Sequence, residues 1–442
     1  MQKPTIIILS VFSLFGIALA GLSIATVQYG TIEKPRLGSF PIPQARLVSQ
    51  THPAWEIKPD GDVKPLPAYL EKSLEWLAQA QAENGGWGAG LHSMQNVRDP
   101  KSVQIDPATT AYVAMALLRA GNTLNTGPYS QQLVKATNCL LQIVNDAPQN
   151  HMNITTVTGT QPQQKLGQNI DVAMTVQYFA RLMPYIQDDQ VLSDRVGNAM
   201  DFCIQRLQGT QMADGSWNAA GWAPVLNSAM ANNALELSEQ VGRKVDIDAL
   251  EKSRQYQSDN VRSDDAGGVA TDKAAGIQLY ALASAQRATA NDAKVVKEAM
   301  VESESPASAA PVLEEVVVVM EKKGYSKKEA KRMASSYISN QKAGEMLQRD
   351  DVLSGFGNNG GEEFLSYMMT SESLVATDDK EWNNWHKRME GLFEKIQNPD
   401  GSWSGHHCIT SPVFCTAAVI MTLGADRDAL VLKAEKKKPV KQ

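Results

Sequence analysis

Cysteine, aromatic residues and surplus positive charge are all scarce in this sequence. Four cysteines in 442 residues are too few for a disulfide scaffold. Phenylalanine, tryptophan and tyrosine make up only 6% of the chain, which disfavours an aromatic-lined chamber that stabilises a bound cation. Lysine and arginine number 42 against 48 aspartates and glutamates, so the net charge is -6. Because such a chain repels a phosphate backbone, nucleic acid is excluded as an expected partner.

The chain is too long to fold around a single compact hydrophobic core. A single hydrophobic core usually stops growing at roughly 250–300 residues, and this chain has 442. Its hydrophobic share of 43% is that of an ordinary globular protein, so disorder is not the default. Several domains or a repeat architecture are therefore expected.

An apolar segment opens the sequence. A single cation, Lys3, precedes an apolar stretch from Ile6 to about Val27. Residues 18–20 read Ala-Leu-Ala, which is a cleavage signal, so residues 1–30 are predicted to be a signal peptide. The stretch also has about the length of roughly 20 residues that spans a bilayer, which leaves an uncleaved membrane anchor through residues 6–27 open. Either alternative predicts export, to the periplasm or outside the cell.

Composition divides the remaining chain into three parts. Residues 31–66 are rich in proline and lack apolar periodicity, which predicts an extended linker. Residues 67–425 carry the helical patterns, with a charged helical segment inserted at 291–348. Residues 426–442 end in a basic tail that is expected to be solvated. A polar linker is predicted from residue 288 to residue 311, within and just before the inserted segment.

Two kinds of predicted helix alternate along residues 67–425. Helices that are apolar nearly all round need neighbours on every side, whereas amphipathic helices can form an outer wall. The first kind is predicted near 107–121, 168–183, 224–240, 271–286, 362–376 and 410–424. The second kind is predicted near 67–82, 129–146, 191–208, 246–257 and 380–397, with 312–348 supplying the sixth. Six inner and six outer helices predict an all-α fold, an (α/α)6 toroid.

A short motif repeats three times at the ends of predicted outer helices. Each copy places an apolar residue, then Gln four positions later, Gly four after that and Trp two further on. The copies are Leu77/Gln81/Gly85/Trp87, Leu207/Gln211/Gly215/Trp217 and Phe393/Gln397/Gly401/Trp403. Such repetition indicates a repeat architecture. Copies near 264–268 and 355–361 lack the Trp, so the repeat is degenerate there.

These strings resemble the QW motif of squalene and oxidosqualene cyclases and of the wider superfamily that includes protein prenyltransferase β-subunits. The resemblance covers residues 67–425. It implies a terpenoid cyclase-like α/α toroid in which the Gln and Trp residues tie outer helices together and are structural. It is specific for the fold and weak for the activity.

The acids that cyclisation chemistry needs are not arranged in the family patterns. Squalene cyclases supply a protonating acid as D-x-D-D, and ionising terpene synthases bind magnesium through D-D-x-x-D; neither string occurs here. The weak candidates for a catalytic acid are Asp264, Asp265 and Asp272. Whether the chain is an enzyme is left open by the sequence.

A zinc site is the less favoured interpretation of the histidine and cysteine residues. The prenyltransferase string D-x-C occurs at 201–203, but it falls inside a predicted outer helix. The residues that would serve as tetrahedral zinc ligands are His406, His407, Cys408 and Cys415. Adjacent His-His-Cys is poor geometry for three ligands on one ion, so packing or a local disulfide is favoured, and no cofactor is predicted.

Several acids are predicted to meet at one mouth of the toroid. Asp106, Asp171, Asp272, Glu362 and Glu363 fall near the first turns of predicted inner helices, and His406 and His407 precede the last one. Helix capping and the helix dipole explain acids at such positions. The functional alternative is an acidic rim that binds a cation or sugar, or an acid and base pair.

Three functions remain open from the sequence. The favoured one is an exported binding or scaffold toroid that has lost the catalytic motif, with an apolar lipid or a protein as partner. The second is an enzyme acting on a polyprenyl or triterpenoid lipid, which requires an open aromatic-lined chamber. The third is a carbohydrate-active (α/α)6 enzyme, which requires two carboxyl groups about 5 Å or about 6.5–9.5 Å apart in an open cleft. The oligomeric state is not predicted.

Overall fold

Helix pairs follow one another around a common centre in this protein. The computed structural model describes residues 65–149, 151–217, 221–261, 268–303, 312–357, 359–377 and 379–428, all within the unit Leu37–Gln442. In these ranges the secondary structure is helical apart from two isolated β-bridges. The predicted all-α class is confirmed.

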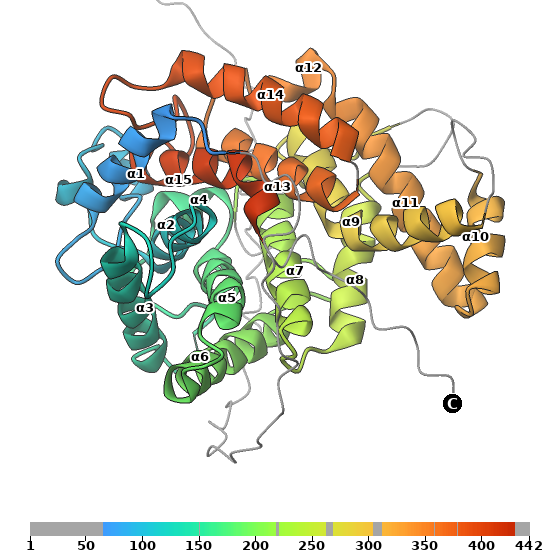
Figure 1. Cartoon of the computed structure of the whole chain (residues 1–442), viewed down its shortest axis with the longest axis horizontal. Helices are drawn as coiled ribbons and strands as arrows, with labels where there is room; N and C mark the ends of the chain where they lie inside the picture. The colour runs from blue at the N-terminus through green and yellow to red at the C-terminus, as the bar shows by residue number, and fades with distance from the viewer. Residues whose placement is uncertain are drawn as a thin grey trace, which may run out of the picture. The chain divides into compact units, whose positions relative to one another are not determined.

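Six inner helices form a closed ring (Figure 1). They are α2 (Pro107–Arg119), α5 (Ile170–Leu182), α7 (Pro224–Gln240), α9 (Gln278–Glu302), α13 (Gly361–Thr377) and α15 (Pro412–Leu423). Each one packs against the next, and α15 returns to pack against α2. Every residue of α2, α5 and α15 is buried. This burial on all sides is what helices that are apolar nearly all round require.

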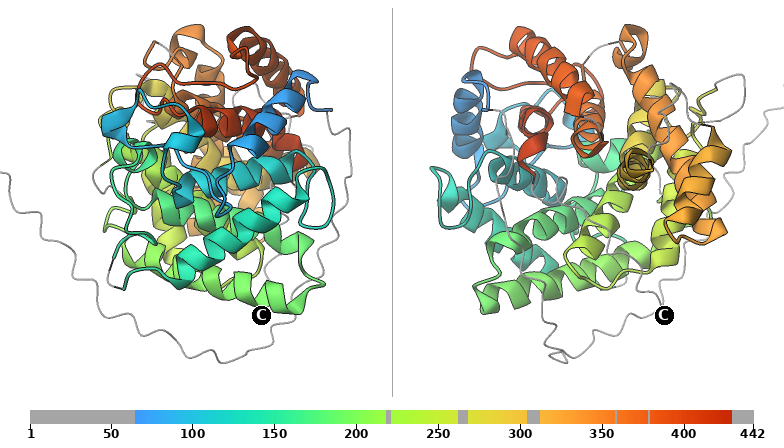
Figure 2. Two further views of the ribbon diagram at one scale, coloured as in Figure 1. Left: turned by 90° about the vertical axis from the view of Figure 1, so that its left-hand side faces the viewer. Right: turned by 45° about the vertical axis from the view of Figure 1, so that its right-hand side comes forward.

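Six outer helices surround this ring. They are α1 (Tyr69–Ala80), α3 (Ser130–Asn145), α6 (Gln190–Gly209), α8 (Ile247–Ser258), α11 (Lys327–Leu347) and α14 (Asp379–Ile396). They pack on α15, α2, α5, α7, α9 and α13 respectively. The predicted (α/α)6 toroid of inner and outer helices is therefore confirmed, and two further views show the layers (Figure 2).

Short elements fill the connections. Three are α-helical: α4 (Gln161–Lys165), α10 (Leu313–Lys322) and α12 (Asp350–Leu353). Four are single 3-10 turns: η1 (His92–Met94), η2 (Pro100–Ser102), η3 (Met183–Tyr185) and η4 (Ala425–Arg427). None of the helices in the described ranges is both long enough and apolar enough to cross a membrane. The apolar segment 6–27 lies outside those ranges.

The fourth inner helix differs from its prediction at both ends. It begins at Gln278 rather than near 271, because the preceding residues form a turn with Ala275 and Gly276 at positive φ. It also continues to Glu302, through residues that were predicted to be a polar linker. That extension is helical because it packs with α10 and α11 in a small second core. The residues of this core include Val296, Met300, Val316, Met320 and Met333.

The fifth outer helix begins at a capping box. Ser326 accepts a bond from the Glu329 backbone N–H, and the Glu329 carboxylate accepts one from the Ser326 backbone N–H. This reciprocal pairing satisfies two donors that would otherwise be exposed at the helix start. The capping box therefore fixes the start of α11.

The three Gln-Gly-Trp copies are corners where an outer helix ends. In each corner the Trp indole N–H donates to the backbone carbonyl ten residues earlier, in the last turns of that helix. The bonds join Trp87 to Leu77 (2.8 Å), Trp217 to Leu207 (2.8 Å) and Trp403 to Phe393 (2.9 Å). All three tryptophans are buried, so each one fixes a helix end within the core.

The corner glutamines join successive outer helices. Gln81 donates to the carbonyl of Gln132 near the start of α3 (2.9 Å), and Gln211 to that of Ala249 near the start of α8 (2.9 Å). Gln397 donates to Ser73 Oγ on α1 (3.1 Å), which closes the ring between the last outer helix and the first. Each of these three glutamines therefore links two outer helices through a hydrogen bond.

Each corner also needs its glycine. Gly85, Gly215 and Gly401 have φ of 89°, 87° and 93°, a conformation that side chains rarely adopt. A Cβ atom at Gly215 would lie 2.3 Å from the backbone oxygen of Lys252 on the next outer helix. The glycine therefore permits both the turn and the close approach of the neighbouring repeat.

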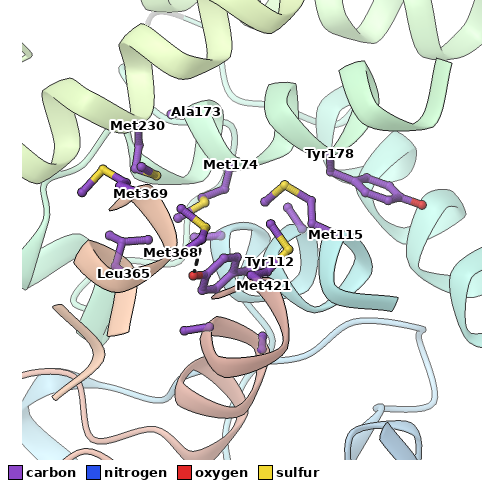
Figure 3. Packing of buried hydrophobic residues seen from close by; sticks show 14 of the residues in the cluster. Tyr112, Met115, Ala173, Met174, Tyr178, Met230, Leu365, Met368, Met369 and Met421 are labelled. Carbon is purple, nitrogen blue, oxygen red and sulfur yellow. Dashed lines mark hydrogen bonds between the residues drawn. The ribbon is translucent and has the colours of Figure 1, made fainter. Parts of the chain in front are cut away.

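Methionine side chains fill the centre of the ring (Figure 3). They come from five inner helices and are Met115, Met174, Met230, Met368, Met369 and Met421, all at most 1% exposed. Tyr112 lies among them and donates its hydroxyl to Met368 Sδ (3.4 Å). A chamber that held water or ligand would leave accessible surface on its walls. The near-zero exposure of these side chains therefore means that they pack against one another.

Candidate functional site at the mouth of the ring

The ring mouth is the end at which the inner helices begin. Four of the predicted acids lie there: Asp106 caps α2, Asp171 is in the first turn of α5, and Glu362 and Glu363 are in the first turn of α13. All four side chains are fully buried. The structure divides them into two pairs, each held by different loops.

The first pair caps the start of α2. Asp106 accepts hydrogen bonds from the backbone N–H of Ala89 (2.8 Å) and from the N–H of Thr109 (2.8 Å). Asp171, from the neighbouring helix α5, accepts one from the backbone N–H of Ala108 (3.0 Å). Both carboxyls thus bind backbone donors at one helix N-terminus.

Burial controls the protonation of this pair. Burial, and then the charge of Asp171, raises the pKa of Asp106 to about 7. Burial likewise raises the pKa of Asp171. Two carboxyls this deep in the protein resist being ionised together, so one proton is retained near neutral pH.

The Asp106 pair predicts a loss of stability as the pH rises from about 4 to neutral. Because folding favours the protonated form, its stabilisation is complete below about pH 4 and is lost as the pH rises through about 7. We expect the free energy of unfolding to fall by about 1–3 kcal/mol across that range, and Asp106→Asn to reduce the fall. Chemical denaturation at a series of pH values measures it. Asp246→Asn, at the exposed N-cap of α8, is the matched control; equal slopes in wild type and Asp106→Asn would contradict the prediction.

The second pair lies between α13 and the loop before α15. Glu363 accepts from the Tyr280 hydroxyl (2.6 Å) and from the Gly360 N–H (3.0 Å). Glu362 accepts from the Ile409 N–H (3.2 Å), and burial, followed by the charge of Glu363, raises its pKa to about 8. Both acids therefore accept hydrogen bonds from residues of the protein itself.

A chain of aromatic rings borders the second pair. Trp222 contacts Phe356 edge to face with centroids 5.7 Å apart, and Phe356 contacts His407 at 5.1 Å. Lys165 Nζ lies 5.1 Å from the Trp222 ring centroid, a cation–π distance. His407 Nε2 is 3.7 Å from Glu363 Oε2, so this predicted residue does reach an acid of the mouth.

The remaining predicted site residues lie apart from these two pairs. Asp272 is exposed in the turn before α9, because that helix starts later than predicted. Asp264 and Asp265 lie outside the described residues. His406 is exposed, and its backbone N–H donates to the Asn359 carbonyl (2.7 Å). The five acids therefore do not gather into one rim.

Loops at the ring mouth are joined to one another by buried hydrogen bonds. Gln161, which is fully buried, donates to the Ala89 carbonyl (2.8 Å) and accepts from the Thr410 N–H (2.7 Å). It thereby joins the first corner to the loop before α15, the same loop in which the His406 N–H meets the Asn359 carbonyl. Sequence reasoning missed Gln161, because its role depends on two loops that are far apart in the chain. The Thr160 N-cap of α4 was the one local signal.

The histidines and cysteines show no metal-binding cluster. Within the described ranges, no group of three or more His, Cys, Asp or Glu side chains is placed to hold a metal ion. Cys408 and Cys415 are both free thiols, and burial, then the charge of Glu362, raises the pKa of Cys408 to about 12. Asp201 of the D-x-C string pairs with Arg243 on the outside of the ring, and Cys203 is buried.

The opposite end of the ring carries a buried ionic cluster that the sequence analysis did not predict. Glu372 on α13 accepts hydrogen bonds from Arg119, Arg181 and Arg287 of three other inner helices. Asp428 pairs with Arg119 (2.7 Å) and Arg181 (2.6 Å). Arg119 and Arg181 lie in the last turns of their helices, where the helix dipole favours a cation. That position was the only signal in the sequence.

Comparison with known families agrees with the ring and its corners. The family model of the squalene-hopene cyclase C-terminal domain matches residues 60–160, which include the first Gln-Gly-Trp corner. The chain is an α/α toroid, and its first repeat is similar to this cyclase domain. A search of the curated proteins found no match to this chain.

Among solved structures, the toroid is similar to the GH76A alpha-1,6-mannanase from Salegentibacter sp. HEL1_6. The sequence identity is 12% and the TM-score 0.48, and the alignment covers 81% of this chain and 98% of the mannanase chain.

Proposed function

We propose that this toroid is an exported binding or scaffold protein without catalytic activity. The packed centre carries this proposal. Met174, Met230 and Met369 come from three different inner helices and have no accessible surface. Cyclisation or prenyl transfer inside a toroid needs a chamber that admits the lipid, and these side chains occupy the place where such a chamber would be.

The acids of the mouth support the same proposal. Asp106 and Asp171 bind backbone donors at the start of α2, and Glu363 binds Tyr280 and the Gly360 N–H. A glycoside-cleaving pair needs two carboxyls that face an open cleft with room for a sugar. Fully buried carboxyls that already accept intramolecular bonds instead stabilise the loops and helix ends.

Export is proposed from the opening sequence. The apolar segment 6–27 and the Ala-Leu-Ala string at 18–20 are the supporting features. Expression of the full chain, cell fractionation and intact-mass measurement test this part. A chain recovered outside the cytoplasm, either shortened by the signal peptide or full-length in the membrane fraction, supports it. A full-length chain in the cytoplasmic fraction overturns it.

Product analysis tests the absence of catalysis. We expect the purified protein to give no product from squalene, from a polyprenyl diphosphate or from mannan oligosaccharides, and native mass spectrometry to show no retained isoprenoid. Glu363→Gln is the informative variant because Glu363 joins the aromatic chain to α13. Turnover that Glu363→Gln abolishes would overturn the proposal in favour of an enzyme at the mouth. A retained isoprenoid would favour the lipid enzyme.

A further inference from the structure

A polar pocket opens on the outside of the ring, far along the helices from the packed mouth. Its volume is about 360 Å³, which is in the range of small-molecule sites. Its lining comes from the inner helices α9 and α13 and from the outer helices α11 and α14 with the residue after α11. The residues that line it are Gln286, Asn340, Gln341, Gly344, Glu345, Gln348, Leu374, Thr377 and Glu381.

A degenerate corner lies along the chain between the two outer helices that flank this pocket. At three other joints a corner Gln binds the start of the next outer helix. The segment after α11 contains the copy at 355–361 that lacks its Trp, so α11 and α14 are not joined in that way. Instead Arg388 of α14 donates to the Gln348 carbonyl at the end of α11 (2.8 Å). The two helices enclose the pocket between them.

A buried acceptor on the pocket floor is left for a ligand. Gln286 is only 1% exposed, and its Oε1 has no hydrogen-bond partner in the part of the chain that the structure describes. A buried amide oxygen without a hydrogen-bond partner destabilises the folded protein, because it has lost its bonds to water. Asn340 beside it is already bound, because its amide donates to the Gln286 backbone carbonyl (2.7 Å). A ligand that donates a hydrogen bond to Gln286 Oε1 would recover that cost.

A glycine keeps the pocket open. Gly344 lies inside α11, where glycine is less favourable to a helix than alanine. A Cβ atom at this position would lie 3.0 Å from Gln286 Nε2. The glycine therefore leaves room for the Gln286 amide and for the space in front of it.

The lining indicates the chemistry of the ligand. Four amide side chains both donate and accept, and two carboxylates, Glu345 and Glu381, accept. Two cations lie at the pocket edge: Lys297 donates to the Thr377 carbonyl, and Arg388 donates to the Gln348 carbonyl and pairs with Asp350. Hydroxyl groups satisfy donors and acceptors together without adding charge. We propose that this pocket binds a small uncharged polyhydroxylated ligand of the size of a mono- or disaccharide.

This site goes beyond the proposed function and does not depend on it. The pocket is built from α9, α11, α13 and α14, whereas the acids of the mouth lie at the starts of α2, α5 and α13. The pocket would be present whether or not the acids of the mouth catalyse a reaction. The two proposals therefore fail in separate experiments.

Saturation-transfer NMR on the purified full chain tests the proposal. The probes are glucose, mannose, galactose, N-acetylglucosamine, maltose and cellobiose, with spermidine as a cationic comparison. Gly344→Leu places a large side chain in the pocket, and leucine is a residue that favours helix formation. Gln286→Leu removes the unpaired acceptor Gln286 Oε1. Gly391→Leu is the matched control, because Gly391 lies on α14 with open space around it and does not line the pocket.

We expect at least one sugar to receive saturation from the wild-type protein and from Gly391→Leu. We expect the signal to be lost in Gly344→Leu and the affinity to fall about tenfold or more in Gln286→Leu. Thermal unfolding of each variant separates lost binding from lost folding. No signal from any sugar, or a sugar signal that survives in Gly344→Leu, overturns the proposal. Binding of spermidine alone, lost in Gly344→Leu, overturns the ligand class.

Discussion

Replacement of Glu372 by Gln is expected to lower the free energy of unfolding by about 3–5 kcal/mol, because it removes the charge around which three buried arginines are arranged. Arg119, Arg181 and Arg287 all donate to this carboxylate, and it is fully buried. Gln keeps the size of the side chain but leaves the arginines with less compensating charge. Urea denaturation at pH 7 measures the loss.

The pH dependence of the same variant gives a second measurement. Burial alone would raise the pKa of Glu372, but Arg119, Arg181 and Arg287 outweigh it and lower the pKa to about 2. The folded protein therefore gains stability from this carboxylate above about pH 4.5, and loses it as the pH falls towards 2. Glu372→Gln is expected to reduce the acid sensitivity in that range.

An exposed ion pair supplies the control for Glu372. Arg349 and Asp351 form a pair on the surface, and because water screens this pair we expect Asp351→Asn to leave the urea midpoint close to that of wild type. If Glu372→Gln cost no more than this control, the buried cluster would not contribute to the stability of the ring.

Met174→Ala is expected to cost about 2–5 kcal/mol, because the cavity that it creates in a packed core cannot collapse fully. Met174 lies on α5, between Met115 and Met368 in the close view of the centre (Figure 3), and it has no accessible surface. Met230→Ala, on α7, is expected to behave in the same way. Thermal and urea unfolding of both variants measure the cost.

The same measurement distinguishes a packed centre from a ligand chamber. Side chains that line an open chamber already face space, so their truncation costs little. Met212, which is half exposed after α6, is the matched control, and Met212→Ala is expected to stay within about 0.5 kcal/mol of wild type. A cost at Met174 as small as that at Met212 would contradict the packed centre and would reopen the lipid enzyme.

The ring follows from signals that are local in the sequence. Trp87, Trp217 and Trp403 each bind a carbonyl only ten residues away, so the corner can be recognised from one short string. The inner helices are recognisable for a similar reason, because burial on all sides favours apolar and small residues around most of the helix. These features fix which helices are inner and which are outer before any tertiary contact is known.

The tertiary structure alone decided the parts that bear on function. Asp106 and Asp171 could be placed at helix starts from the sequence, but only the fold showed that both bind donors of α2. The cluster around Glu372 joins residues from four inner helices, and the Gln286 pocket is lined by residues of two inner and two outer helices. A hydrogen bond between residues ten positions apart can be predicted from a short sequence motif. Burial, charge pairing and open space instead depend on which distant segments the closed ring brings together.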